Sequence, residues 1–173
     1  MAAVTGPQHI VVMGVSGAGK TTTGEALAAH LGWPFVEGDA FHPQSNVDKM
    51  AHGTPLTDAD RQPWLQALAD QIAAAEARGE SSVLGCSSLK RSYRDILRTG
   101  APRVRFLHVH GTREVLADRL NHRAGHFFPP KLLDSQLATL EPLAEDEDGA
   151  VIDMMLSPRD QVAQAIRLLG LAP

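Results

Sequence analysis

The sequence predicts an α/β protein in which helices cover both faces of a parallel sheet, in three layers. Short apolar runs alternate with segments of helical spacing along the whole chain. The clearest run, residues 9–13, lacks polar alternation, which is typical of a strand covered on both faces. A length of 173 residues with 43% hydrophobic residues suits one domain with one core. We therefore expect a single domain over residues 1–173.

The expected strands and helices follow from these runs in order. The strands are expected at residues 9–13, 34–37, 82–86, 104–109 and 150–153. The helices are expected at residues 21–31, 57–79, 89–98, 112–123 and 131–140, and from residue 157 onward. An acidic stretch at residues 141–148 has few apolar side chains and is expected to be an exposed loop.

Residues typical of helix ends support several of these boundaries. Gly32 is the expected stop of the first helix. Thr57 and Asp60 form a capping-box pattern, with Asp in place of the usual Glu. Ser157 followed by Pro158 is a cap with proline in the first turn.

Composition excludes several functional classes. A net charge of −4 argues against a nucleic-acid binder that relies on bulk positive charge. The single cysteine, Cys86, excludes an internal disulfide framework and a cysteine-based zinc cluster, and is expected to pack as a small apolar residue. No apolar run approaches membrane-spanning length, and the first eight residues lack the features of a signal peptide. A cytoplasmic protein that contacts neither membrane nor nucleic acid is expected.

Residues 14–21, GVSGAGKT, match the phosphate-loop pattern G-x-x-x-x-G-K-[ST] between a predicted strand and a predicted helix. Glycines let backbone amides surround phosphate oxygens, and the helix N-terminus adds partial positive charge. Lys20 is expected to reach the β- and γ-phosphates of ATP, and Thr21 to bind Mg²⁺. The predicted nucleotide-binding residues here are Gly14, Ser16, Gly17, Ala18, Gly19, Lys20, Thr21 and Thr22.

Among P-loop proteins, a small-molecule kinase fits best. The guanine-reading N-K-x-D of a GTPase is missing, and the D-x-x-G string at residues 146–149 lies in the acidic stretch. An ATPase motor needs an apolar strand ending in Asp; residues 150–153 have that form, but they are the last strand of a short chain. A kinase instead needs a phosphate loop, an acceptor pocket and a lid that excludes water.

Five further stretches make this interpretation specific. They are Gly38-Asp39-Ala40-Phe41-His42-Pro43, Asp58 to Leu65, Cys86 to Arg98, Arg119 to Phe127, and Leu132 to Glu141. Between the first two, Asn46, Lys49, Met50, Gly53, Pro55 and Leu56 belong to the same pattern. Together they resemble the gluconate kinases of the shikimate and gluconate kinase group, from about residue 9 to about residue 168. Members of that group more often have Asp where this chain has Glu37, and Met where it has Phe128.

The resemblance implies a P-loop NTPase fold like that of nucleoside monophosphate kinases, with a five-stranded parallel sheet and a helical lid. It implies an acceptor-binding segment at about residues 39–65 and a lid at about residues 121–142. It also implies ATP and D-gluconate as substrates, 6-phosphogluconate as product, and a homodimer.

Two carboxylates near the second strand are candidates for the chemistry. Asp39 faces the acceptor in the resemblance and is the expected catalytic base, although an Asp before a helix is also a common cap. Glu37 is expected on the metal side with Thr21, where it would hold a water on Mg²⁺, with a structural role as the alternative.

A sugar acid calls for cations and neutral hydrogen-bonding groups. Arg61 is the best candidate for its oxygens, and the Lys90-Arg91 pair is either a second cationic segment or a solvated helix face. The full predicted acceptor set is Asp39, His42, Lys49, Arg61, Lys90, Arg91, Arg94, His126 and Gln136.

Arg119 and Arg123 lie four residues apart, so one helix face carries both. One guanidinium is expected to stack on the adenine and the other to reach the phosphates, which makes Arg123 a predicted catalytic residue beside Lys20 and Asp39. A plain solvated helix surface is the alternative. For the whole chain, the rivals are a kinase of another polyol acid such as shikimate, and a catalytically silent nucleotide-binding regulator.

Overall fold

The computed structural model describes residues 6–122 and 129–171. Its centre is a parallel sheet in the order β2-β3-β1-β4-β5. The strands are β1 (His9–Met13), β2 (Phe35–Glu37), β3 (Ser82–Gly85), β4 (Val104–His110) and β5 (Gly149–Asp153). In the middle of the sheet, Val11 pairs with Leu84 on one side and with Phe106 on the other. The predicted five-stranded parallel sheet is confirmed.

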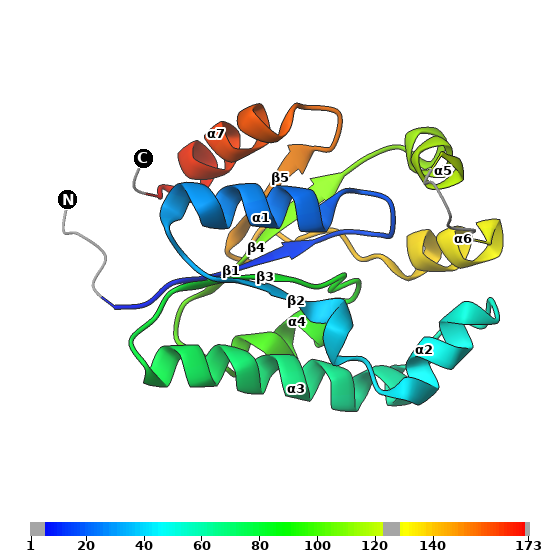
Figure 1. Cartoon of the computed structure of the whole chain (residues 1–173), viewed down its shortest axis with the longest axis horizontal. Helices are drawn as coiled ribbons and strands as arrows, with labels where there is room; N and C mark the ends of the chain where they lie inside the picture. The colour runs from blue at the N-terminus through cyan, green and yellow to red at the C-terminus, as the bar shows by residue number, and fades with distance from the viewer. Residues whose placement is uncertain (1–5, 123–128, 172–173) are drawn as a thin grey trace.

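Helices cover both faces of this sheet. One face carries α1 (Lys20–Leu31) and α7 (Pro158–Leu169), and the other carries α3 (Asp58–Ala77) and α4 (Arg91–Arg98) (Figure 1). The 3₁₀ helix η1 (Gly38–Phe41) directly follows β2. Three helices gather beyond the carboxyl ends of the strands (Figure 1): α2 (Gln44–Ala51), α5 (Arg113–Asn121) and α6 (Pro130–Thr139).

The core forms where the predicted apolar runs meet the helices. Every residue of β1 is buried, as expected for the central strand of a covered sheet. Trp64 of α3 is 2% exposed, and its indole Nε1 donates to the Gly38 carbonyl at 2.8 Å. Cys86 is fully buried, and that burial raises the pKa of its thiol to about 11. It packs as the small apolar residue that the sequence predicts.

The predicted helix ends are confirmed where local chemistry decides them. The Thr57 hydroxyl accepts from the Asp60 amide while the Asp60 carboxylate accepts from the Thr57 amide, so the capping box is complete. Ser157 caps α7, and Gly32 ends α1 in the left-handed conformation.

Helix α2 was not expected from the sequence. Its side chains are mostly polar; Asn46 is its buried residue, while its valine, Val47, is 41% exposed. A helix whose inward side is polar leaves no apolar stripe to detect.

The acidic stretch at residues 141–148 departs from the expected exposed loop. The Glu147 side chain is fully buried, where it forms an ion pair with Arg94 of α4. A buried partner of opposite charge makes this placement possible, and composition alone does not reveal it. Within the described part of the chain, no helix has both the length and the apolarity needed to cross a membrane.

Candidate active site

The phosphate loop joins β1 to α1 and owes its shape to glycine. Gly17 and Gly19 both have φ near +89°, a conformation that residues with a Cβ rarely adopt. A Cβ on Gly17 would also lie 2.9 Å from the Leu120 side chain of α5. The loop is therefore curled tightly, and α1 begins at Lys20 with its amide end directed at the space that the loop surrounds.

The polar groups at the start of α1 lie close to β2. The Lys20 ammonium donates to the Val15 carbonyl at 3.1 Å. The Thr21 hydroxyl donates to the Glu37 carboxylate, whose other oxygen accepts from the Asp39 amide at 3.4 Å. Thr21 and Glu37 thus present neighbouring oxygen atoms, as the sequence predicts for the metal side. No group of three or more His, Cys, Asp or Glu side chains suited to a metal occurs among the described residues.

A cavity of about 290 Å³ lies over the phosphate loop. Its described lining consists of Ser16, Gly17, Gly19, Lys20, Thr21, Thr22, Asp39 and Arg119. The loop itself and Arg119 of α5 therefore face one space, although nearly one hundred positions separate them. Of the predicted nucleotide-binding residues, Gly14 and Ala18 belong to the loop without lining this cavity.

A second cavity of about 160 Å³ adjoins the first and shares Ser16, Lys20 and Asp39 with it. Its further polar lining is His42, Thr54, Arg61, Ser87, Ser135 and Gln136, and its apolar lining is Met50, Pro55, Leu56, Trp64, Leu89 and Leu132. The sequence predicts His42, Arg61 and Gln136 here. Thr54, Ser87 and Ser135 were missed as site residues, because short hydroxyl side chains carry no distinctive sequence signal.

Neighbouring groups hold the Arg61 guanidinium in place. Its Nη1 donates to the Leu56 carbonyl at 2.9 Å and to the Tyr93 hydroxyl at 3.0 Å. The Tyr93 hydroxyl in turn donates to Asp58. Arg61 is thus fixed at the wall of the second cavity. Among the residues that the structure describes, no carboxylate forms an ion pair with its guanidinium.

Gln136 links α6 to the phosphate loop. Its Oε1 accepts from the Ser16 amide at 2.7 Å, and its Nε2 donates to the Ser16 hydroxyl at 3.0 Å. The described part of the predicted lid segment therefore reaches the place where the two cavities meet.

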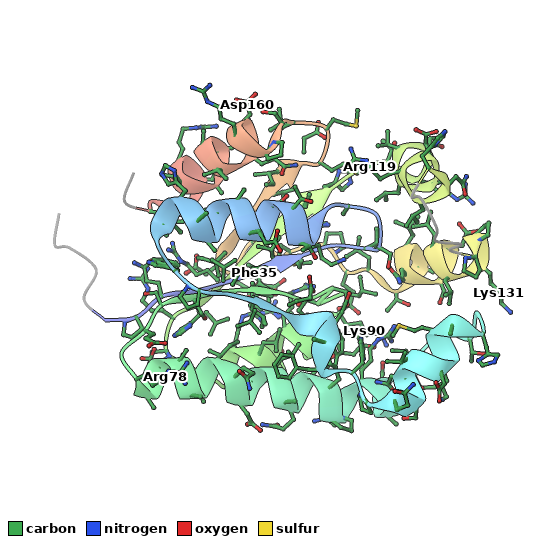
Figure 2. The ribbon with its side chains drawn as sticks, viewed as in Figure 1. Phe35, Arg78, Lys90, Arg119, Lys131 and Asp160 are labelled. Carbon is green, nitrogen blue, oxygen red and sulfur yellow. The ribbon has the colours of Figure 1, made fainter. Side chains whose placement is uncertain are left out.

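Three predicted acceptor-binding cations lie outside the lining of the second cavity and pair with carboxylates instead. Lys49 pairs with Asp60 at 2.8 Å, Lys90 with Asp58 at 3.0 Å, and Arg91 with Asp146 at 2.7 Å. Figure 2 shows Lys90 and Arg119 at the end of the molecule where α2, α5 and α6 gather, and Arg78 at the opposite end. Lys90 is thus near this edge of the sheet without reaching the cavity.

The predicted acceptor role of Arg94 is wrong. Its side chain is completely buried, and Nε and Nη2 donate to the Glu147 carboxylate at 2.7 and 2.8 Å. Nη1 donates to the carbonyls of Ser88 and Glu141 at 2.9 and 3.0 Å. A position just after a strand suggested the active edge, but the turn of α4 directs this guanidinium into the interior.

Glu147 is held ionised in that interior. Burial acts to raise the pKa of its carboxyl, but hydrogen bonds from Arg94, the Ala144 amide and Arg98 outweigh burial and lower the pKa to about 2. The group of Arg94, Arg98 and Glu147 thus joins α4 to the segment before β5. The remaining predicted site residues, Arg123 and His126, lie outside the described residues.

Known proteins resemble this chain in sequence and in fold. The sequence model described as an AAA domain matches residues 10–143. A gluconokinase from Gluconobacter oxydans is 54% identical over 141 residues, which cover 82% of this chain and 79% of the relative.

Two solved structures are also similar. A sugar kinase from Janibacter sp. HTCC2649 has 49% identity and a TM-score of 0.91, with 96% of each chain covered. A gluconokinase from Sinorhizobium meliloti has 47% identity and a TM-score of 0.86, with 95% of this chain and 92% of that chain covered. Given this identity over most of its length, the phosphate loop and the adjoining second cavity, the chain belongs to the gluconokinase family of P-loop kinases.

Proposed function

We propose that this chain transfers the γ-phosphoryl group of ATP to D-gluconate and releases ADP and 6-phospho-D-gluconate. The observation that carries the proposal is the junction of two cavities at Lys20 and Asp39, in a member of the gluconokinase family. A phosphoryl donor in the first cavity and an acceptor in the second would meet at these two side chains.

ATP would bind in the first cavity, over the phosphate loop. The amides of the loop and the N-terminus of α1 bind phosphate oxygens, and the Lys20 ammonium neutralises charge that develops on the transferring group. Arg119 lines the same cavity from α5, where its guanidinium can contact either the phosphates or the base.

Thr21 and Glu37 would hold Mg²⁺. Their hydroxyl and carboxylate oxygens lie side by side, and hard oxygen ligands of this kind suit that ion, which keeps several waters when bound. When present, Mg²⁺ neutralises charge on the β- and γ-phosphate oxygens.

Asp39 would act on the substrate that accepts the phosphoryl group. It lines both cavities, so its carboxylate can accept the proton of the attacking hydroxyl or orient that hydroxyl toward the phosphoryl group. Arg61 and His42 also line the second cavity. A guanidinium fixed by Leu56 and Tyr93 is suited to a carboxylate, and gluconate has one where glucose has none.

The experiment is ATP turnover measured with D-gluconate, with glucose, with shikimate and with no acceptor, and the product identified by mass spectrometry. We expect gluconate to be preferred over glucose by at least about 30-fold in kcat/KM, because a neutral analogue leaves the half-buried Arg61 guanidinium without a carboxylate partner. Equal turnover without an acceptor would contradict the proposal, as would a preference for shikimate.

We also propose a cytoplasmic homodimer, which the family resemblance implies. Its mass in solution, measured by light scattering on the full chain, tests the oligomeric state; a monomer at micromolar concentration would contradict it.

A further inference from the structure

The Asn46 side chain is the polar group that α2 buries, with 2% of the residue exposed. Its amide nitrogen Nδ2 lies 2.9 Å from the Asp60 carbonyl oxygen and 3.2 Å from Nδ1 of His42. A backbone carbonyl only accepts hydrogen bonds, so the amide nitrogen and not the amide oxygen must face Asp60. This contact fixes the orientation of the Asn46 amide.

The fixed amide determines the state of the His42 ring. An amide nitrogen only donates, so Nδ1 of His42 must accept, and the proton of the neutral ring must be on Nε2. Burial lowers the pKa of His42; Asp39 of η1 acts in the opposite direction, and Arg61 of α3 lowers the pKa further. Among the described residues, Asp39 and Arg61 are the charged groups that act on the ring. Burial has the largest effect and the net change in the pKa is downward, which favours the neutral ring.

The position of the His42 ring leaves its Nε2 atom available to the substrate that accepts the phosphoryl group. His42 stacks on Trp64 with 3.9 Å between ring centroids and 20° between planes, so the ring is held at the wall of the second cavity. Asn46 occupies the Nδ1 side and does not line that cavity. Nε2 makes no hydrogen bond with any residue that the structure describes.

We propose that Asn46 is a positioning residue that holds His42 in the Nε2–H tautomer, so that the ring is a fixed hydrogen-bond donor to the acceptor substrate. This inference rests on the proposed function and deepens it. With Arg61, the cavity wall then has two groups that only donate, and it also has Asp39, which only accepts when ionised. Such a wall selects a substrate with a carboxylate or hydroxyl oxygen at His42, together with one hydroxyl whose proton can go to Asp39.

The tautomer can be measured directly on the full chain without substrate. Two-bond ¹H–¹⁵N correlation spectra separate a protonated from an unprotonated ring nitrogen in each histidine, and the His42→Gln variant identifies the His42 signals. At neutral pH we expect Nε2 to be protonated and Nδ1 unprotonated. A proton on Nδ1, or a doubly protonated ring, would overturn the inference.

The Asn46→Asp variant tests the functional consequence. A carboxylate at this position accepts from Nδ1–H and raises the pKa of His42. Below that pKa the imidazolium still donates from Nε2; above it the proton stays on Nδ1 and the donor to the substrate is lost. Relative to the unmodified chain, kcat/KM for gluconate should therefore fall about tenfold or more between about pH 6 and about pH 9, while KM for ATP stays within about twofold.

Gln44→Glu is the matched control, because it makes the same amide-to-carboxylate change on the exposed side of α2. It should leave the pH profile unchanged. A uniform loss of activity in Asn46→Asp at all pH values would mean that Asn46 has only a structural role, and would overturn the inference.

The two proposals fail in different ways. If the unmodified chain does not phosphorylate gluconate, the proposed function fails, whatever the histidine spectrum shows. If it does so with the His42 proton on Nδ1, only the present inference fails. Should Asn46→Asp not fold, as judged by circular dichroism, the spectrum of the unmodified chain still decides the question.

Discussion

The two cavities are assembled in different ways. All but two of the described residues that line the phosphate-loop cavity come from one continuous stretch, residues 16–22. The lining of the acceptor cavity comes instead from the phosphate loop, η1, α2, α3, α6 and the loops after α2 and β3. A site made by one segment depends on local backbone chemistry, whereas a site made by many segments depends on how the helices pack.

Two arginines show what this difference means. Arg61 and Arg94 both lie in stretches that the sequence predicts to bind the acceptor substrate. Arg94 belongs to α4, and Arg61 donates to Tyr93 of α4. Arg61 lines the cavity, held by a carbonyl and a hydroxyl, whereas Arg94 is buried against Glu147. Residue type and position in the chain predicted the same acceptor-binding role for both arginines. The packing of α3 and α4 gives only Arg61 a place in the cavity wall. The following variants test that separation, in order of decreasing effect on turnover.

Asp39→Asn should have the largest effect, because this residue lines both cavities. The change removes the charge and keeps the shape, so nucleotide binding should persist while turnover with gluconate falls by about 10²–10⁴-fold. Calorimetric titration with ADP and a coupled kinase assay measure the two effects. Weakened nucleotide binding with normal turnover would instead make Asp39 a metal-side or structural residue, and Glu37 would become the better candidate base.

Lys20→Ala tests the phosphate-loop cavity, which one continuous stretch of the chain forms. Loss of the ammonium that neutralises the transferring phosphoryl group should lower kcat by about 10²-fold or more. Thermal unfolding should change little, because Lys20 lies at the loop end of α1 and is not part of the apolar core. A variant that keeps more than half of the turnover would contradict the assignment of the phosphate loop.

Arg61→Ala tests the acceptor cavity, which several segments of the chain form together. Arg91→Ala is its matched control. Loss of the cation that would pair with the gluconate carboxylate should lower kcat/KM for gluconate by about 30-fold or more, with little change in KM for ATP. Arg61→Lys should rescue this only in part, because an ammonium lacks the two-pronged geometry of guanidinium. Arg91 pairs with Asp146 at the surface, so its removal should change kcat/KM by less than about twofold. Equal losses in the two alanine variants would contradict the placement of the acceptor.

Arg94→Met should change stability rather than chemistry. Removing Arg94 leaves the buried Glu147 carboxylate with only the Arg98 guanidinium and the Ala144 amide as partners, so the free energy of unfolding should fall by up to about 3–5 kcal/mol in urea titrations. The double variant Arg94→Met with Glu147→Leu should recover much of this loss, because no buried charge remains. The folded fraction of the single variant should keep a near-normal kcat/KM for gluconate; a specific rise in KM for gluconate would restore Arg94 to the acceptor site.

Acid should weaken the same ion pair in the unmodified chain. The pKa of Glu147 is lowered to about 2 in the folded state from an ordinary value of 4.5. Its contribution to stability is therefore complete above the ordinary pKa and is lost as the pH falls toward about 2. Urea midpoints measured between neutral and strongly acidic pH should decrease less steeply in the double variant. Parallel decreases in both proteins would contradict this account.

A feature could be predicted from the sequence when the interactions that form it join residues close together in the chain. The phosphate loop, the Thr57 capping box and the Gly32 helix end were all predictable, because each depends on residues within a few positions of one another. Helix α2 was missed because its buried residue is Asn46 rather than an apolar one. The role of Asn46 depends on a carbonyl of α3 and on the ring of His42, and neither contact can be predicted from the spacing of apolar residues.

The sequence by itself determined the parallel α/β class, the phosphate loop and the family, because these depend on local backbone preferences, apolar periodicity and motifs that are continuous in the chain. Only the tertiary structure decided the strand order and which cations face the acceptor. It also buried Glu147 against Arg94, brought Gln136 to Ser16, and set the direction of the hydrogen bond at His42. Each of these depends on groups far apart in the chain whose charges and hydrogen bonds must be satisfied together once water is excluded, and that condition exists only in the packed molecule.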